Sequence, residues 1–199
     1  MRSIKYSCKM RTFFLFLFIS LIAFTSNAQK RALLVIDVQN FYFSGPNALV
    51  NPDSAAQAAA ILLKHFRGNG ELVVHVKHEA KAGEDIHTSV TPKEGEKVIK
   101  KMKVNSFSGT DLDQYLRKNG ITELVVCGMM THMCVEAAFR AATDLGYKCT
   151  LVADACATRD LMFGGVAIPA KMVHHSTLAS LTYYGKVLTL DEFLKQQKK

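Results

Sequence analysis

The chain of 199 residues contains 25 lysines and arginines against 17 aspartates and glutamates, which gives a formal net charge of +8. Four of the basic residues lie within positions 1–28, where there is no acidic residue, so residues 29–199 carry only +4. The basic residues of this larger part are scattered or lie in the C-terminal tail. A nucleic-acid binder should have a clustered basic face or interleaved aromatic residues, so that class of protein is not expected.

The first 28 residues have the composition of a secretory signal. A basic leader precedes the apolar run at 13–24, and the small residues Ser26 and Ala28 follow it. This order is typical of a cleaved export signal, and the apolar run is too short for a membrane span of roughly 20 residues. We predict cleavage after Ala28 and a periplasmic or secreted protein without stable membrane insertion. Residues 29–199 then form one domain of usual size.

After the leader, short apolar runs alternate with helical patterns. The continuous apolar run 32–36 indicates a strand covered on both faces. A helix is expected from Asp53, as its N-cap, to Phe66. Further strands are expected at 72–76, 124–127, 148–153 and 186–188, and further helices at 110–119, 132–145 and 170–183. This alternation predicts a three-layer α/β/α sandwich with a mostly parallel, Rossmann-like sheet.

Three further expectations concern a helix start, a loop and the cysteines. Thr110 and Asp113 have the spacing of a capping box at the start of the 110–119 helix. The polar segment 78–97 has no strong period, so we expect an active-site cover or an oligomer contact there. Cys127 and Cys149 lie in or beside apolar strand-like runs, where free cysteine behaves as a small buried hydrophobe, and no disulfide is expected.

Chemically active residues follow the predicted strands. Ligands of an open parallel sheet bind beyond the carboxyl ends of its strands. Asp37 follows the first strand, His78 the second, the segment 128–134 the third, and Asp154 the fourth. A carboxylate, an imidazole and the thiol of Cys134 are therefore expected at one edge of the sheet.

Cys134 is the sharpest candidate for catalysis. With Thr131 as the N-cap, Cys134 lies in the first helical turn, where the helix dipole favours thiolate and unpaired amides can receive an oxyanion. Asp37 is placed to accept the thiol proton. The alternatives are a structural buried cysteine and an aspartate that stabilises a turn. Lys100, Lys101 and Lys103 lie close together, and their spacing does not choose the inward one.

A metal site is not indicated. The histidines, including His78, His87 and His132, show no HExxH spacing, and there is no Cys-x-x-Cys pair. We therefore predict no metal and no other cofactor.

Four segments in order resemble the isochorismatase-like cysteine hydrolases. They are Leu34–Gln39, Glu96–Lys101 ahead of Asn105-Ser106-Phe107 and Gly109–Leu112, Val126–Val135, and Asp154–Ala157. The resemblance runs from about residue 31 to 193. It implies the isochorismatase-like fold and a triad of Asp37, Lys101 and Cys134. Lys101 is chosen over Lys103 because the family's lysine stands four residues before the Asn-Ser-Phe segment.

The resemblance also implies details of the site. It suggests a cis peptide between Met129 and Met130, with the amides of Met130 and Cys134 directed at the substrate oxygen. It suggests a homo-oligomer, a tetramer or octamer. The residues expected to contact a small-molecule substrate are Gln39, Phe43, His78, Phe107 and Thr131, with Phe41 and Phe163 as further aromatic candidates.

The implied reaction is hydrolysis of an amide-type C–N bond through a thioester on Cys134. The segment 41–47 lacks the histidine of metal-dependent nicotinamidases. Family members that cleave the vinyl ether of isochorismate tend to lack the cysteine. Three alternatives remain: vinyl-ether or ester hydrolysis on the same fold, a non-catalytic ligand-binding homologue, and a thiol redox role.

Overall fold

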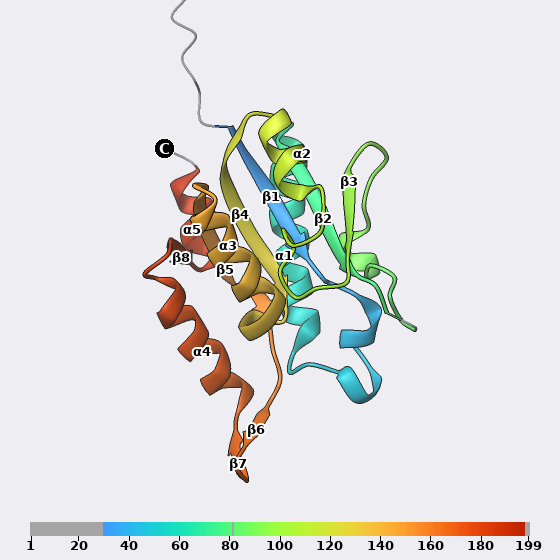
Figure 1. Ribbon diagram of the computed structural model, residues 1–199, viewed down its shortest axis with the longest axis vertical. Helices are drawn as coiled ribbons and strands as arrows, with labels where there is room; N and C mark the ends of the chain where they lie inside the picture. The colour runs from blue at the N-terminus through green and yellow to red at the C-terminus, as the bar shows by residue number, and fades with distance from the viewer. Residues whose placement is uncertain (1–29, 81, 198–199) are drawn as a thin grey trace, which may run out of the picture.

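A six-stranded parallel sheet forms the centre of the molecule (Figure 1). The computed structural model describes residues 30–80 and 82–197, so the expected signal segment lies outside the described residues. In spatial order the strands are β3 (Lys97–Lys101), β2 (Leu72–His78), β1 (Lys30–Ile36), β4 (Ile121–Met129), β5 (Lys148–Ala157) and β8 (Lys186–Leu188). Every neighbouring pair is parallel, which confirms the predicted sheet.

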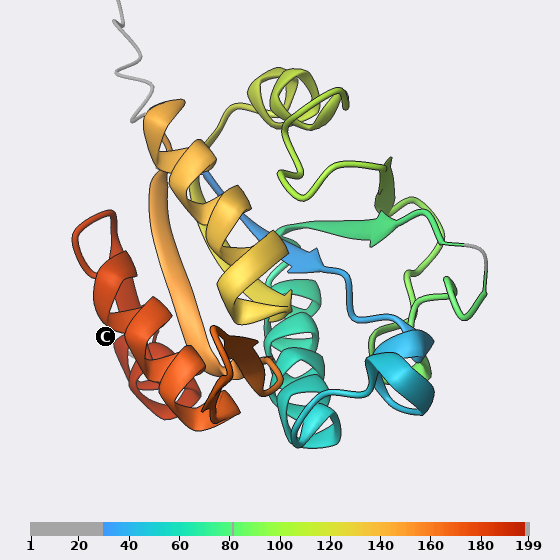
Figure 2. The same cartoon turned by 60° about the horizontal axis from the view of Figure 1, so that its bottom comes forward.

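Helices cover both faces of the sheet, as Figure 2 shows from a second direction. On one face lie α1 (Pro52–Gly68) and α5 (Leu190–Gln196), which pack Phe66 and Phe193 against the sheet. On the other lie α2 (Leu112–Lys118), α3 (Glu136–Asp144) and α4 (Ala170–Leu181). Strand residues alternate between the two cores: Leu33 and Val35 face α1, whereas Leu34 and Ile36 face α3. The three-layer sandwich is confirmed.

Short helical turns complete the chain. Three 3-10 turns lie in loops near the carboxyl ends of the strands, at Asn40–Tyr42, Gly45–Asn47 and Thr88–Val90. A π-helical turn, Thr131–Val135, leads directly into α3. None of the described helices is long and apolar enough to cross a membrane.

Two helix starts differ from the sequence prediction. Asp53 is not the N-cap of α1: the helix begins at Pro52, and the preceding Asn51 has the left-handed backbone conformation. The predicted capping box of Thr110 and Asp113 is also absent from α2, whose N-cap is Asp111 without a side-chain bond. Asp113 instead accepts hydrogen bonds from Arg117 and Tyr147. Asp53 and Asp113 are each the second residue of their helix, where the helix dipole still favours a carboxylate.

Helix α5 and the hairpin of β6 and β7 were among the elements missed from the sequence. Helix α5 follows β8 and begins with a capping box formed by Thr189 and Glu192. Strands β6 (Leu161–Phe163) and β7 (Val166–Ile168) form a hairpin that extends beyond the carboxyl ends of the sheet (Figure 1). The tip of the hairpin exposes Phe163, at 83% of its surface, and Met162.

Candidate active site

The three residues of the expected triad meet at the carboxyl ends of the central strands. Asp37 directly follows β1, Lys101 is the last residue of β3, and Cys134 lies in the π-helical turn after β4. All three are buried, with exposed fractions of 0%, 2% and 5% respectively. Lys100 and Lys103 are exposed, so β3 turns only Lys101 inward.

The ammonium group of Lys101 holds the site together. Its Nζ lies 2.7 Å from Asp37 Oδ2 and 3.2 Å from Cys134 Sγ. The same nitrogen is 3.3 Å from Nδ1 of His78, the last residue of β2. The ammonium group of Lys101 therefore contacts one side chain from each of three neighbouring segments.

Burial sets the protonation of the site. Burial first, and the charge of Asp37 next, raise the pKa of Cys134 to about 12 against the opposing effect of Lys101. Burial also raises the pKa of Asp37, and the positive charge of Lys101 acts in the opposite direction. The helix terminus was expected to favour the thiolate, whereas desolvation acts in the opposite direction and raises the pKa of the thiol. The resting thiol is therefore protonated, and a nearby base is needed to activate it.

Thr131 does not cap the helix as expected. Its hydroxyl lies 3.2 Å from the carbonyl oxygen of Ala157, to which it donates, and 2.9 Å from Nδ1 of His174. The N-cap residue is Met130, which makes no side-chain bond to the turn. The hydroxyl of Thr131 therefore ties the Cys134 segment to the end of β5 and to α4.

The backbone between β4 and Cys134 has an unusual course. Gly128 has φ 127°, and a Cβ atom there would lie 1.9 Å from the carbonyl oxygen of Ile36. Only glycine lets β1 and β4 approach this closely. The peptide between Met129 and Met130 is cis, in agreement with the resemblance, and Asp37 across the strand pair has φ 49°.

A pocket of about 440 Å³ opens onto Cys134. Its wall is largely apolar and aromatic, and His78 and Arg159 are its basic side chains. The lining residues are Phe41, Tyr42, Asn47, His78, Ala80, Ala82, Val104, Met130, Met133, Cys134 and Arg159. The volume and the mixed lining are typical of a site for a small molecule. We call this cavity the Cys134 pocket.

Of the residues expected to contact substrate, the structure places His78 and Phe41 in the wall of the Cys134 pocket. Phe43 stacks on His87 with ring centroids 3.7 Å apart, and Phe107 packs against Tyr147 in the core beneath α3. Both lie outside the lining of the pocket, as does Phe163 at the hairpin tip. Aromatic composition alone did not distinguish pocket from core.

Gln39 has a different position from the expected one. Its side-chain amide donates to the carbonyl oxygens of His78 and Glu84, and its Oε1 accepts from the amide of His78. The side chain is completely buried. Gln39 therefore fastens the segment after β2 beside Asp37, so that His78 stays against Lys101.

Tyr42, Met133 and Arg159 line the pocket and were missed. Arg159 comes two residues after β5, which runs to Ala157 and not to residue 153 as predicted. Ligand-binding residues of a parallel sheet lie just after the carboxyl ends of its strands, so a correct prediction of the end of β5 would have identified Arg159 as a candidate.

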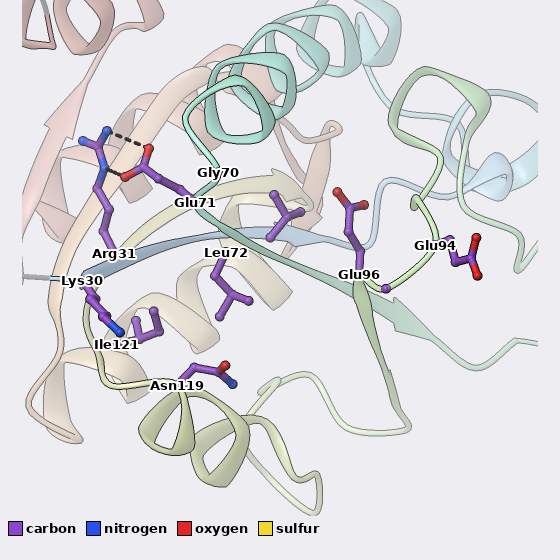
Figure 3. Close-up of a pocket in the computed structure, with 11 residues that line it drawn as sticks. Lys30, Arg31, Gly70, Glu71, Leu72, Glu94, Glu96, Asn119 and Ile121 are labelled. Carbon is purple, nitrogen blue, oxygen red and sulfur yellow. Dashed lines mark hydrogen bonds and ion pairs between the residues drawn. The ribbon is translucent and has the colours of Figure 1, made fainter.

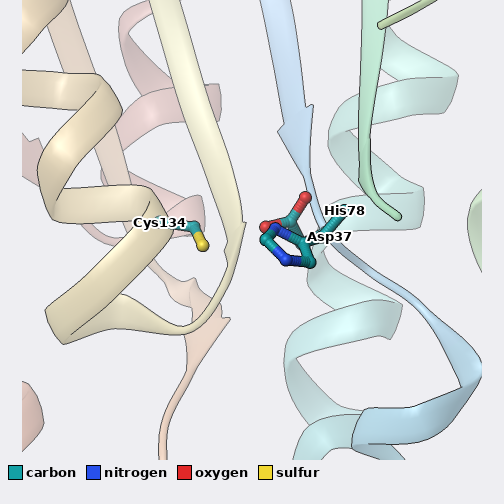
Figure 4. Close-up of side chains that lie close together, drawn as sticks. All are labelled: Asp37, His78 and Cys134. Atoms are coloured by element: carbon teal, nitrogen blue, oxygen red, sulfur yellow. The ribbon is translucent and has the colours of Figure 1, made fainter. Parts of the chain in front are cut away.

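Asp37, His78 and Cys134 present a possible metal-binding set (Figure 4). One ligand atom from each lies within 4.8 Å of the other two. The Nζ of Lys101, however, lies within 3.3 Å of an atom of all three residues. A cation in that position would meet the lysine's own charge, so the donor set fits a lysine and does not fit a metal ion.

A second cavity, of about 650 Å³, lies at the opposite end of the strands (Figure 3). It surrounds the amino ends of β1 and β2, where Arg31 forms an ion pair with Glu71. The described residues that line it include no cysteine, serine or histidine. Its chemistry therefore does not compete with the Cys134 pocket as a catalytic centre.

Comparison with known proteins identifies the family. The model of the isochorismatase domain matches residues 31–190. YddQ, an isochorismatase family protein of Bacillus subtilis, is 48% identical over 177 residues, which cover 82% of this chain and 98% of that protein. The ureidoacrylate amidohydrolase RutB of Variovorax paradoxus is 33% identical over 170 residues, covering 84% of this chain and 64% of RutB.

Solved structures agree with the sequence comparisons. A crystal structure from Oleispira antarctica, assigned to the isochorismatase hydrolases, superposes with a TM-score of 0.81 at 44% identity. The superposition covers 84% of this chain and 97% of that one. The chain therefore belongs to the isochorismatase family of hydrolases.

Proposed function

We propose that the protein is a cysteine hydrolase that cleaves an amide-type C–N bond of a small molecule. The observation that carries the proposal is the position of Lys101 Nζ, 2.7 Å from Asp37 and 3.2 Å from Cys134, the residue that lines the Cys134 pocket. A nucleophile, a base and an orienting third group within contact distance form the general pattern of covalent catalysis.

The first half-reaction would form a thioester. The Cys134 thiol passes its proton to Asp37, and the positive charge of Lys101 stabilises the new thiolate while it keeps both groups in place. The sulfur attacks the amide carbonyl carbon, and the oxygen takes up the electron pair. We assign the amides of Met130 and Cys134 to the oxyanion, because such preorganised donors stabilise developing charge. Collapse breaks the C–N bond, and the proton on Asp37 leaves with the amine.

The second half-reaction would return the enzyme to its starting state. Water enters the place of the departed amine and gives one proton to Asp37. The hydroxide attacks the thioester carbon, the C–S bond breaks, and Cys134 regains the proton. One amide and one water thereby give one carboxylic acid and one amine.

The kind of bond is supported by a relative. RutB is described by its name as an amidohydrolase, and its similarity to this chain spans 84% of the residues. The composition of residues 1–28 supports the further proposal that the enzyme works in the periplasm or outside the cell. Mass spectrometry of protein recovered from that compartment tests this, since cleavage after Ala28 predicts a polypeptide beginning at Gln29.

The test of the reaction is ammonia release from a panel of small primary amides, combined with mass spectrometry of the quenched enzyme. We expect ammonia release and an acyl adduct on the peptide that contains Cys134. Cys134→Ala should abolish both. Hydrolysis of esters or vinyl ethers without hydrolysis of amides would move the assignment to another bond. A folded protein that binds amides without ammonia release or adduct would be a non-catalytic homologue.

A further inference from the structure

The Cys134 pocket contains a cation that the proposed reaction does not use. Arg159 lines the same pocket as Cys134 and is partly buried there. It reaches the pocket from the end of β5, whereas Asp37, Lys101 and Cys134 come from β1, β3 and the turn after β4. The triad has its own positive charge in Lys101, so the proposed reaction leaves the guanidinium group of Arg159 without an assigned role.

Three carboxylates of the site and its flanking elements have partners other than Arg159. The adjacent Asp160 accepts a hydrogen bond from the amide of Ala170 at 2.7 Å, at the start of α4. Glu136 pairs with Arg140 at 2.7 Å, and Asp37 pairs with Lys101. Across the part of the chain that the structure describes, no acidic group lies within ion-pair distance of Arg159.

The backbone on both sides of Arg159 is fixed. The carbonyl oxygen of Thr158 accepts from the amide of Val50 at 2.9 Å, and its hydroxyl lies 2.6 Å from Nδ1 of His132. On the other side, Asp160 is held by its bond to α4. Because these bonds already order the segment, binding of a ligand by Arg159 costs less conformational entropy than it would in a mobile loop.

We infer that the substrate carries a carboxylate, which Arg159 binds, at the end remote from the bond that is cleaved. A guanidinium group matches a carboxylate with two parallel N–H···O bonds. The inference rests on the proposed function and names the substrate class: short amides of dicarboxylic acids. Between the two polar ends, the apolar side chains of Tyr42, Met130 and Met133 would contact the carbon chain.

The test compares matched amides. The monoamides of malonate, succinate and glutarate are each paired with the neutral amide in which a methyl group replaces the carboxylate. We expect the acidic member to have the higher kcat/KM in at least one pair. Arg159→Gln should lower kcat/KM for that acid by about 10- to 100-fold, the usual effect of a lost charge-assisted hydrogen bond, and should shrink the ratio of acidic to neutral substrate. Arg159→Lys keeps the charge but not the planar geometry and should retain part of the preference.

A matched control removes an exposed cation that is next in sequence to a residue of the pocket wall. Lys103 is exposed and precedes the lining residue Val104, so Lys103→Gln tests a general effect of charge. The ratio of acidic to neutral substrate should stay at the wild-type value in this variant. A ratio that falls equally in Lys103→Gln and Arg159→Gln would overturn the inference, as would equal use of acidic and neutral amides by the wild-type enzyme.

Binding separates this inference from the proposed reaction. Calorimetry with the same monoamides is carried out on Cys134→Ala, with and without Arg159→Gln. Acid binding that is lost with Arg159→Gln, in a protein that releases no ammonia from any amide, would keep the carboxylate site and reject the reaction. The opposite outcome is that the enzyme releases ammonia from amides while Arg159→Gln leaves the binding of the monoamide acids unchanged. That result would support the reaction and reject the carboxylate site.

Discussion

Nζ of Lys101 lies 2.7 Å from Oδ2 of Asp37, and neither side chain is accessible to solvent. Two opposite charges removed from water stabilise each other only while both are present. Removing one partner of such a pair leaves an uncompensated buried charge. The Asp37–Lys101 pair therefore affects folding as well as the proposed chemistry.

Lys101→Met should lower the free energy of unfolding by about 3–5 kcal/mol, because Asp37 is left buried without its counter-charge. The double variant Asp37→Asn/Lys101→Met should regain part of this stability without regaining activity. Urea unfolding at pH 7 measures both. Lys100→Met is the matched control, since Lys100 is the exposed neighbour on β3 and should change stability by less than about 0.5 kcal/mol. Similar losses in the two lysine variants would contradict the assignment of a buried pair.

Asp37→Asn should make the Cys134 thiol more reactive while it abolishes hydrolysis. The charge of Asp37 is one of the causes that raise the pKa of Cys134 to about 12, and Lys101 acts in the opposite direction. Removing the carboxylate leaves the lysine, so the pKa of the thiol should fall. The pH dependence of alkylation by iodoacetamide, read on the Cys134 peptide, measures this shift.

The remaining cysteines serve as internal controls for that experiment. Burial raises the pKa of Cys149 to about 11 and that of Cys156 to about 12, and neither lines the Cys134 pocket. Their labelling in the folded protein should stay slow in both forms. If Asp37→Asn moved the alkylation profile of Cys134 to higher pH, Asp37 would not be the neighbouring charge that controls the thiol.

The order of the main strands and helices and the positions of Asp37 and Cys134 were predictable because each depends on a local pattern. Continuous apolar runs mark strands covered on both faces; Asp37 follows such a run directly, and Cys134 lies in the turn after the end of β4. The choice of Lys101 needed the family resemblance, because strand alternation separates Lys100 from Lys101 without saying which faces inward. Only the pairing of β3 with β2 in the folded sheet turns Lys101 toward Asp37.

The pocket wall was less predictable because it depends on long-range packing. Phe41 and Phe43 are two residues apart, yet Phe41 lines the pocket and Phe43 stacks on His87. Likewise, burial is the main cause that raises the pKa of Cys134, and the position of the residue at a helix start gives no information on burial. The homo-oligomer and the export signal stay predictions.

Glu96 should account for much of the loss of stability in acid. It accepts from Nε and Nη2 of Arg67, both at 2.7 Å, from the amide of Lys93, and pairs with His75. Burial alone would raise its pKa, but these bonds outweigh burial and lower the pKa to about 2. A carboxylate with a depressed pKa stabilises the fold above its unfolded pKa, here 4.5, and this contribution is lost as the pH falls toward 2.

Glu96→Gln should therefore flatten the decline of the unfolding free energy between about pH 4.5 and pH 2. Urea unfolding at several pH values in this range measures the slope. Glu94→Gln is the control, because Glu94 is exposed two residues away. If the unfolding free energy of Glu96→Gln fell as steeply with falling pH as that of the wild-type protein, other carboxylates would be the main cause of the loss of stability in acid.

Gly128→Ala should damage both the fold and the site. The added Cβ would meet the carbonyl oxygen of Ile36 at 1.9 Å, and φ 127° is a conformation that alanine avoids. Because the contact is with backbone, neither neighbour can rotate away, and we expect a loss of at least about 3 kcal/mol in the free energy of unfolding. Gly68→Ala, at the end of α1 with nothing within 4 Å of the new Cβ, should be nearly neutral. Separation of β4 from β1 would also move Cys134 away from Asp37, so ammonia release should fall even at temperatures where Gly128→Ala remains folded. Full activity in a stably folded Gly128→Ala protein would show that the approach of the two strands does not position the thiol.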